Sequence, residues 1–251
     1  MAIMPYMAKI LQGARGFFLQ LSIMAGACAA LLAATACGSE GAPSSREGLP
    51  PAETLLARSA QAMAQVRSIR FSLTNENGET PLPDGLALRS AKGSLVHPDK
   101  MEAQFAARVA GFPVELKVIS ANDRTYVTNP LTGRWQTYDY ALGLLAFLDA
   151  EKGLVQIMRS MSGPVVSAGP ATDGAETYRV KGSIPATSVA FMTTGALEGA
   201  RVDVDILIGA RDSLMREAKL FGRISEGEPP GMSRVLELSS FNQTFAIAAP
   251  Q

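Results

Sequence analysis

The spacing of hydrophobic residues changes near residue 68 from a helical period to a strand-like one. Between residues 51 and 66, apolar or small residues recur at intervals of three and four, which predicts a helix. From Ser68 onward, Ile69, Phe71 and Leu73 alternate with polar residues. The alternation continues over residues 86–96, 101–109, 112–118 and 125–128, with short turns between them. Successive strands joined by short links predict an antiparallel meander.

The second half of the chain mixes both periods. Residues 141–148 and 152–161 are helical in pattern, and Gly163-Pro164 is expected to end the second helix. Strands are predicted at 165–167 and 176–182, and a short helix at 185–193. Three more strands are predicted at 202–208, 214–220 and 236–238. These elements predict an α+β fold with a single large curved antiparallel β-sheet, a half-barrel, whose concave face is covered by helices.

Many positions expected to face the interior are small, and they include Ala91, Gly93, Ala103, Ala107 and Ala218. Small residues inside a large curved sheet favour an enclosed apolar cavity. The same residues would equally let the helices pack close to the sheet.

The first 36 residues have the layout of an export signal. Lys9 and Arg15 precede an apolar stretch over residues 17–36 that contains no acidic residue. Residues 32–37, LAATAC, resemble a bacterial lipobox, in which the cysteine, here Cys37, is lipidated and becomes the new N-terminus. Cleavage before Cys28, an ordinary cleaved signal, or a retained transmembrane anchor remain open, because about 20 apolar residues can span a bilayer. All of these place residues 50–251 outside the cytoplasm.

The expected domain organisation follows from this layout. A lipoprotein signal peptide covers residues 1–36 and a flexible tether covers 37–50, which are small, polar and rich in proline. A folded domain covers residues 51–251.

Charge and composition exclude several classes of function. The chain has 23 basic and 23 acidic residues, so no basic excess exists to neutralise nucleic-acid phosphates. One histidine, His97, and two cysteines argue against a zinc site or a Cys/His nucleophile. Asp203 and Asp205 could pair as acid and base, but alternating charge on the solvent side of a strand is commoner. We therefore expect no enzyme, no catalytic or metal-binding residues and no cofactor.

Local features in a particular order carry a family resemblance over about residues 50–245. The first helix runs into VRSIRF at 66–71, and KGSL at 92–95 leads to Pro98. DRTYV at 123–127 precedes GRW at 133–135, and YRVKG follows at 178–182. The strand at 214–220 and LELS at 236–239 complete the order. This arrangement resembles the LppX/LprG-type (LppX_LprAFG) lipoprotein family of mycobacteria and relatives.

The resemblance implies a half-barrel similar to the LolA/LolB carriers, with a hydrophobic cavity for acylated lipids or glycolipids that are moved outward across the cell envelope. It implies a protein anchored on the extracytoplasmic face of the cell membrane through a diacylglycerol-modified and palmitate-bearing Cys37. Its partners would be the lipid, the membrane and an envelope transporter or acceptor, without nucleic acid. The rival interpretation is an RseB-like envelope sensor that binds proteins or lipoproteins.

The expected cavity lining combines inward strand positions with the apolar central helices, which would otherwise be ordinary core. Lipid headgroups are expected near Arg124, Arg134 or Trp135. Burial drives such binding at about 0.8 kcal/mol for each CH₂, so no sharp motif is needed. The predicted lining residues are Phe71, Leu73, Phe105, Ala107, Val114, Leu116, Val118, Tyr126, Leu144, Leu145, Leu148, Leu154, Ile157, Met158, Met161, Val204 and Ile206.

Overall fold

A computed structural model of the chain describes residues 48–82, 85–138, 143–149, 151–172, 174–193 and 195–250. These residues belong to one compact unit, Ser45–Gln251. The predicted signal peptide, Cys37 and most of the predicted tether lie outside the described residues. Among the helices that the structure does describe, none has the length and apolarity required to cross a bilayer.

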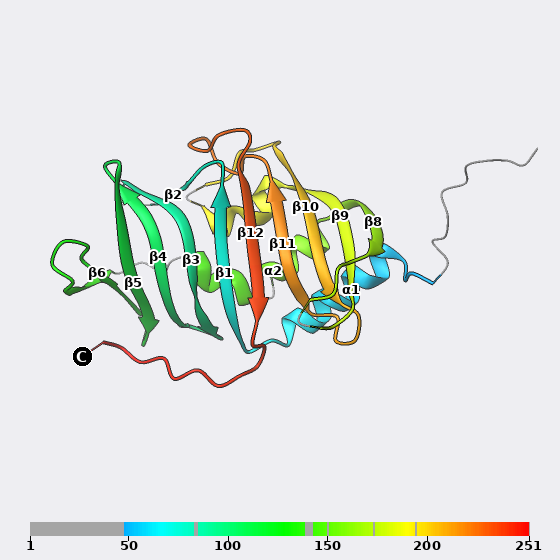
Figure 1. The fold of residues 1–251 in the computed structure, drawn as a ribbon, viewed down its shortest axis with the longest axis horizontal. Helices are drawn as coiled ribbons and strands as arrows, with labels where there is room; N and C mark the ends of the chain where they lie inside the picture. Colours follow the sequence, from blue (N-terminus) through cyan, green and yellow to red (C-terminus); the bar gives the residue numbers. More distant parts are fainter. Residues whose placement is uncertain are drawn as a thin grey trace, which may run out of the picture. The chain divides into compact units, whose positions relative to one another are not determined.

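A 12-stranded antiparallel sheet dominates this unit (Figure 1). The strands follow one another in the order β7-β6-β5-β4-β3-β1-β12-β11-β10-β9-β8, and β2 pairs with β3 beside this path. The predicted fold class is confirmed. The strands are β1 (Ser68–Glu76), β2 (Thr80–Pro81), β3 (Leu86–Val96), β4 (Lys100–Val109), β5 (Phe112–Ala121), β6 (Arg124–Thr128), β7 (Trp135–Tyr138), β8 (Ser162–Ala168), β9 (Thr177–Pro185), β10 (Arg201–Gly209), β11 (Met215–Phe221) and β12 (Ser233–Ser239).

The sheet consists of two meanders joined where the first strand pairs with the last. β1 and β12 are antiparallel, with Phe71 opposite Leu238 and Leu73 opposite Leu236. The described residues between the two meanders, 143–149 and 151–161, lie on one face of the sheet (Figure 1). The first and last strands of the domain are therefore neighbours in the sheet, although almost the whole domain separates them in sequence.

The helices lie on one face of the sheet, here called the inner face (Figure 1). α1 contacts α2 and β8, and α2 also contacts the 3-10 helices η2 and η3. Pro51 precedes α1 and Glu53 lies in its first turn, as expected for a helix N-terminus. The four elements are α1 (Ala52–Ala64), η2 (Gly143–Leu148), α2 (Leu154–Arg159) and η3 (Ala186–Met192).

Three local features differ from the sequence prediction. Gly163-Pro164 lies inside β8 and does not end a helix, because α2 already ends at Arg159. β2 has only two residues, too few to show an alternation. β7, around Trp135, is a strand that the sequence pattern did not indicate.

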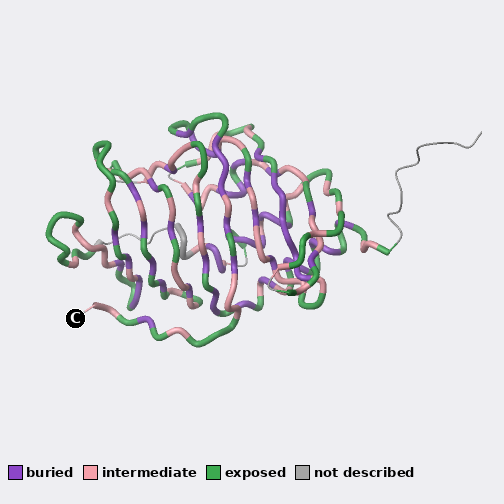
Figure 2. The backbone as a smooth tube through the Cα atoms, in the orientation of Figure 1, coloured by how far each residue is buried: buried purple, intermediate pink, exposed green. Residues whose placement is uncertain are grey.

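Alternating burial along the strands separates the inner face from a solvent-facing outer face (Figure 2). In β4, for example, Met101, Ala103, Phe105 and Ala107 are buried, whereas Glu102 and Gln104 are exposed. The buried apolar side chains of the sheet and helices form one continuous cluster. The core of the domain therefore lies between the inner face and the helices.

Candidate ligand-binding interior

Two transverse rows of side chains cover the inner face of the first meander. Strand pairing aligns Phe71, Gly93, Ala103 and Val118 in one row. It aligns Leu73, Ala91, Phe105 and Leu116 in the next. Small residues thus lie beside large ones in both rows, which leaves room above the small positions for side chains from the helices.

Gly93 is required by the close approach of β3 and β4. A Cβ atom at this position would lie 2.2 Å from the carbonyl oxygen of Glu102 and 2.7 Å from the Cα of Ala103. Real Cβ atoms do not approach backbone atoms so closely, so a side chain here would push the two strands apart.

Phe147 connects the sheet to the helical cover. Its ring makes an edge-to-face contact with Phe71 of β1, with centroids 5.9 Å apart, and another with Phe191 of η3 at 5.4 Å. Such pairs contribute about 0.5–1.5 kcal/mol beyond their buried area. The contacts hold η2 and η3 over the centre of the inner face.

The inner face becomes progressively exposed along β5. Val118 and Leu116 are buried at 1% and 4% exposure, Val114 is half-buried, and Phe112 is 73% exposed. These four residues alternate along one strand and so share the inner face. Leu86 and Val109, which pair at this end of the neighbouring strands, are also half-buried. The apolar interior therefore continues to the surface near the β4–β5 hairpin.

Over residues 51–245 the sequence matches the LppX_LprAFG lipoprotein family. The chain belongs to this family. LprF from Mycobacterium bovis has the same fold, with 18% identity and a TM-score of 0.64 over 79% of this chain and 96% of LprF. The lipoprotein LppX from Mycobacterium tuberculosis follows at 16% identity and a TM-score of 0.57, covering 78% and 98% of the two chains. Comparison with curated proteins gave no match.

In this LppX_LprAFG protein most of the predicted lining residues belong to the apolar cluster. Val114 and Met161 are half-buried and pack against it. Leu144 and Leu145 lie in η2, but their side chains lie outside the part of the structure that is described. Ala107 is buried but is not part of the cluster. The buried members of the cluster are Phe71, Leu73, Phe105, Leu116, Val118, Leu148, Leu154, Ile157, Met158, Val204 and Ile206.

Tyr126 is placed differently from the prediction. It pairs with Ile119, which in turn pairs with the exposed Glu102, so all three share the outer face. The adjacent Val127 pairs with Val118 and takes the inner position. We therefore leave Tyr126 out of the candidate lining.

Phe147 and Phe191 were missing from the predicted lining. Phe147 stands in the apolar run before Leu148, which is the signal that could have identified it. Phe191 belongs to the short helix predicted at 185–193, but only tertiary packing brings that helix to Phe147. Sequence spacing carries no information on that contact.

The polar groups considered for chemistry lie away from this interior. Asp203 is exposed on β10, whereas Asp205 is buried and pairs with Arg179 at 3.4 Å and Lys181 at 3.6 Å. His97 is exposed in the β3–β4 turn. Arg124 and Arg134 are exposed, and Trp135 lies on the outer face opposite Thr128. Within the described ranges, no cluster of three metal-binding side chains occurs.

Proposed function

We propose that this chain is a membrane-anchored lipoprotein that binds acylated lipids or glycolipids between the inner face of the sheet and its helical cover. It would carry them across the cell envelope without a chemical step. Membership of the LppX_LprAFG lipoprotein family and the half-barrel fold support this proposal. The single observation that carries it is the apolar interior that reaches the surface at Phe112.

The shape of the exposed strip favours an elongated apolar ligand. Inner positions of β5 lead from Phe112 through Val114 to the buried Leu116. An acyl chain entering here would meet only apolar side chains along this strand. We propose that this end of β3–β5 is the entrance, and that the buried residues of the predicted lining form the binding surface.

The energy of burial is sufficient for such a ligand. Each CH₂ removed from water contributes about 0.8 kcal/mol, so a sixteen-carbon chain would contribute about 12 kcal/mol. Part of this offsets the cost of separating the helices from the sheet. That cost is limited because η2, whose Phe147 packs on Phe71 of the first meander, has only six residues.

The N-terminal predictions complete the proposal. Residues 1–36 would be the signal peptide, Cys37 the lipidated residue and residues 37–50 the tether, followed by the binding domain 51–251. The domain would then stand on the extracytoplasmic face of the cell membrane. Mass spectrometry of the processed protein would test this, because an acylated Cys37 at the N-terminus excludes Cys28 cleavage and a retained anchor.

Native mass spectrometry of the mature protein, purified from its own host, tests the binding function. We expect a bound lipid that solvent extraction releases and identifies. Replacing Leu116 by Trp fills the inner face and should reduce the lipid-bound fraction at least tenfold. Glu115→Trp on the opposite face of the same strand is the matched control and should retain the lipid.

A ligand-free mass, together with failure of the folded protein to take up added diacyl or triacyl lipid, would refute the proposal. In that case the protein-binding envelope sensor of RseB-like type becomes the first hypothesis to test.

A further inference from the structure

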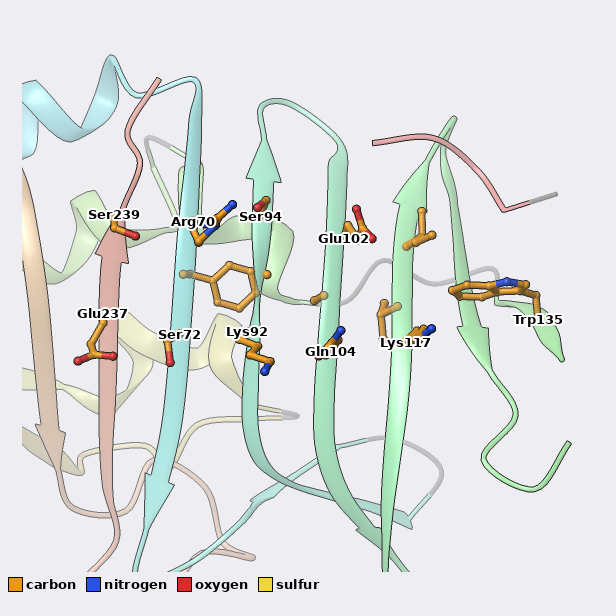
Figure 3. A pocket seen from close by; sticks show the side chains of 15 residues that line it. Arg70, Ser72, Lys92, Ser94, Glu102, Gln104, Lys117, Trp135, Glu237 and Ser239 are labelled. Atoms are coloured by element: carbon orange, nitrogen blue, oxygen red, sulfur yellow. The ribbon is translucent and has the colours of Figure 1, made fainter. Parts of the chain in front are cut away.

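The outer face of the first meander carries a polar hollow that lipid binding does not explain (Figure 3). Two adjoining depressions, of about 710 Å³ and 620 Å³, share Ser72, Lys92, Gln104, Lys117 and Trp135. We treat them as one feature, the outer hollow. It lies on the opposite side of the sheet from the apolar cluster.

Strand register explains how these residues meet. Ser72, Lys92, Gln104 and Lys117 pair across β1, β3, β4 and β5 and form one transverse row. The backbone N–H of Lys117 donates to Thr128 Oγ1 at 2.8 Å, and Thr128 pairs with Trp135, which extends the row to β7. Figure 3 shows the row at one level, with the indole ring of Trp135 projecting from β7 toward Lys117. Ser72 is short and lies between the longer side chains of Glu237 and Lys92, so the hollow is deepest above Ser72.

The charges in the outer hollow differ from those elsewhere on the outer face. Over β9–β11, Lys181 and Arg179 pair with Asp205, and Lys219 pairs with Glu217 at 3.4 Å. In the hollow no such pairs form: within the described part of the chain, none of its charged groups takes part in an ion pair. These groups are Arg70, Lys92, Lys117, Glu102, Glu115 and Glu237.

We propose that the outer hollow binds a neutral saccharide. Sugar hydroxyls are both donors and acceptors, and this hollow offers both kinds of partner: ammonium and amide donors in Lys92, Lys117 and Gln104, and carboxylate acceptors in Glu102 and Glu237. The C–H-rich face of a sugar ring is apolar and packs against an aromatic ring such as that of Trp135. A volume of about 710 Å³ is within the range of small-molecule sites.

The same lining disfavours other ligands. A polyanion would meet three carboxylates beside the three cations of the hollow, and the chain has no net positive charge to attract it. An acyl chain would have to desolvate charged and hydroxyl groups without compensating hydrogen bonds. The polar side chains of the hollow lie on the opposite face of the sheet from the interior, so saccharide binding can be tested separately from lipid binding.

Trp135 makes the test direct, because it is the single tryptophan of the chain. The full mature protein, in a detergent without a sugar headgroup, is titrated with acyl-free maltotetraose, mannotetraose and chitotetraose while tryptophan emission is recorded. We expect at least one of them to change the emission saturably. Gln104→Ala and Lys117→Ala should weaken that saccharide at least fivefold, whereas Lys219→Ala, on the outer face of β11, should leave it unchanged. By calorimetry, Trp135→Ala should weaken binding at least tenfold.

Three results would overturn the proposal. One is no saturable response to any of the three saccharides. Another is an equal response in wild type and in the Gln104→Ala and Lys117→Ala variants. The third is binding only when the sugar is attached to an acyl chain, which would mean that the sugar follows lipid into the interior. Lipid content, measured on the same samples, reports the interior separately and should not change in Gln104→Ala.

Discussion

The ion pair between Arg234 and Glu228 allows a quantitative test of how the second meander is held together. Both side chains are 0% exposed. Glu228 also accepts the backbone N–H groups of Ile224 at 2.7 Å and Ser225 at 3.2 Å, which fixes the loop between β11 and β12. Burial lowers the pKa of Arg234, because desolvation disfavours its charged form, and the contact with Glu228 opposes this effect.

Removing only one partner should be costly. Glu228→Gln keeps an oxygen that can accept the backbone N–H groups, but it leaves the arginine charge buried without a counter-charge. The remaining contacts of Arg234 are weak, at 3.5 Å to the Gly222 carbonyl and to the Met232 sulfur. Breaking a buried pair in this way typically costs about 3–5 kcal/mol. For a domain of this size the melting temperature should fall by about 6–20 °C.

The other variants should rank in a defined order. Arg234→Met leaves Glu228 with its two backbone donors, so we expect a smaller loss than in Glu228→Gln. The double variant removes both charges, and replacement of a whole buried pair by apolar or neutral groups is often close to neutral in stability. It should therefore recover most of the loss of Glu228→Gln.

Calorimetry and urea unfolding at pH 7 measure these differences. Glu217→Gln, which breaks the partly exposed pair with Lys219, is the control and should cost less than about 1 kcal/mol. A double variant less stable than Glu228→Gln, with losses that simply add, would refute the reasoning, because independent losses mean that the two groups do not interact.

Three further predictions follow from single positions. Gly93→Ala should destabilise the fold by about 1–3 kcal/mol in urea unfolding, because the new Cβ meets the Glu102 carbonyl, while Gly195→Ala, with open space around it, should not. Phe112→Ser should slow uptake of a fluorescent acyl lipid from vesicles with little change in stability, whereas Leu131→Ser, at 92% exposure on the loop between β6 and β7, should not slow it. The N–H groups of Glu151 and Lys152 lower the pKa of Asp149, so its stabilising contribution exists above about pH 4 and is lost in more acidic solution. Asp149→Asn should therefore reduce the fall in melting temperature between pH 7 and pH 3.

Local periodicity was sufficient to predict most strands, because the alternation of apolar and polar residues within one strand already shows which positions face inward. In β4 the sequence alone separates Met101, Ala103 and Phe105 from the polar positions between them. β6 has only five residues and carries an apolar side chain at both parities, Tyr126 and Val127. Which of the two faces inward depends on the register with β5, so the sequence could not decide it.

The contacts that close the fold are also non-local. Pairing of β1 with β12 depends on residues such as Phe71 and Leu238, which the local pattern marks as buried but does not bring together. Arg234 contradicts the pattern outright, because it occupies an inward position two residues before the buried Leu236. Its partner Glu228 lies in the preceding loop, and only the folded loop places the carboxylate beside it.

The two meanders are stabilised differently, and this difference is consistent with the proposed carrier function. The inner side of the second meander includes the Arg234–Glu228 pair and fully buried aliphatic side chains such as Ile206 and Leu220. On the first meander the short 3-10 helix η2 packs through Phe147 against Phe71, and the inner face reaches the surface at Phe112. Local opening has the lowest cost where few buried contacts must be broken. A ligand could therefore displace the cover of the first meander while the second keeps the sheet folded, so that the same apolar side chains serve as core when empty and as binding surface when loaded.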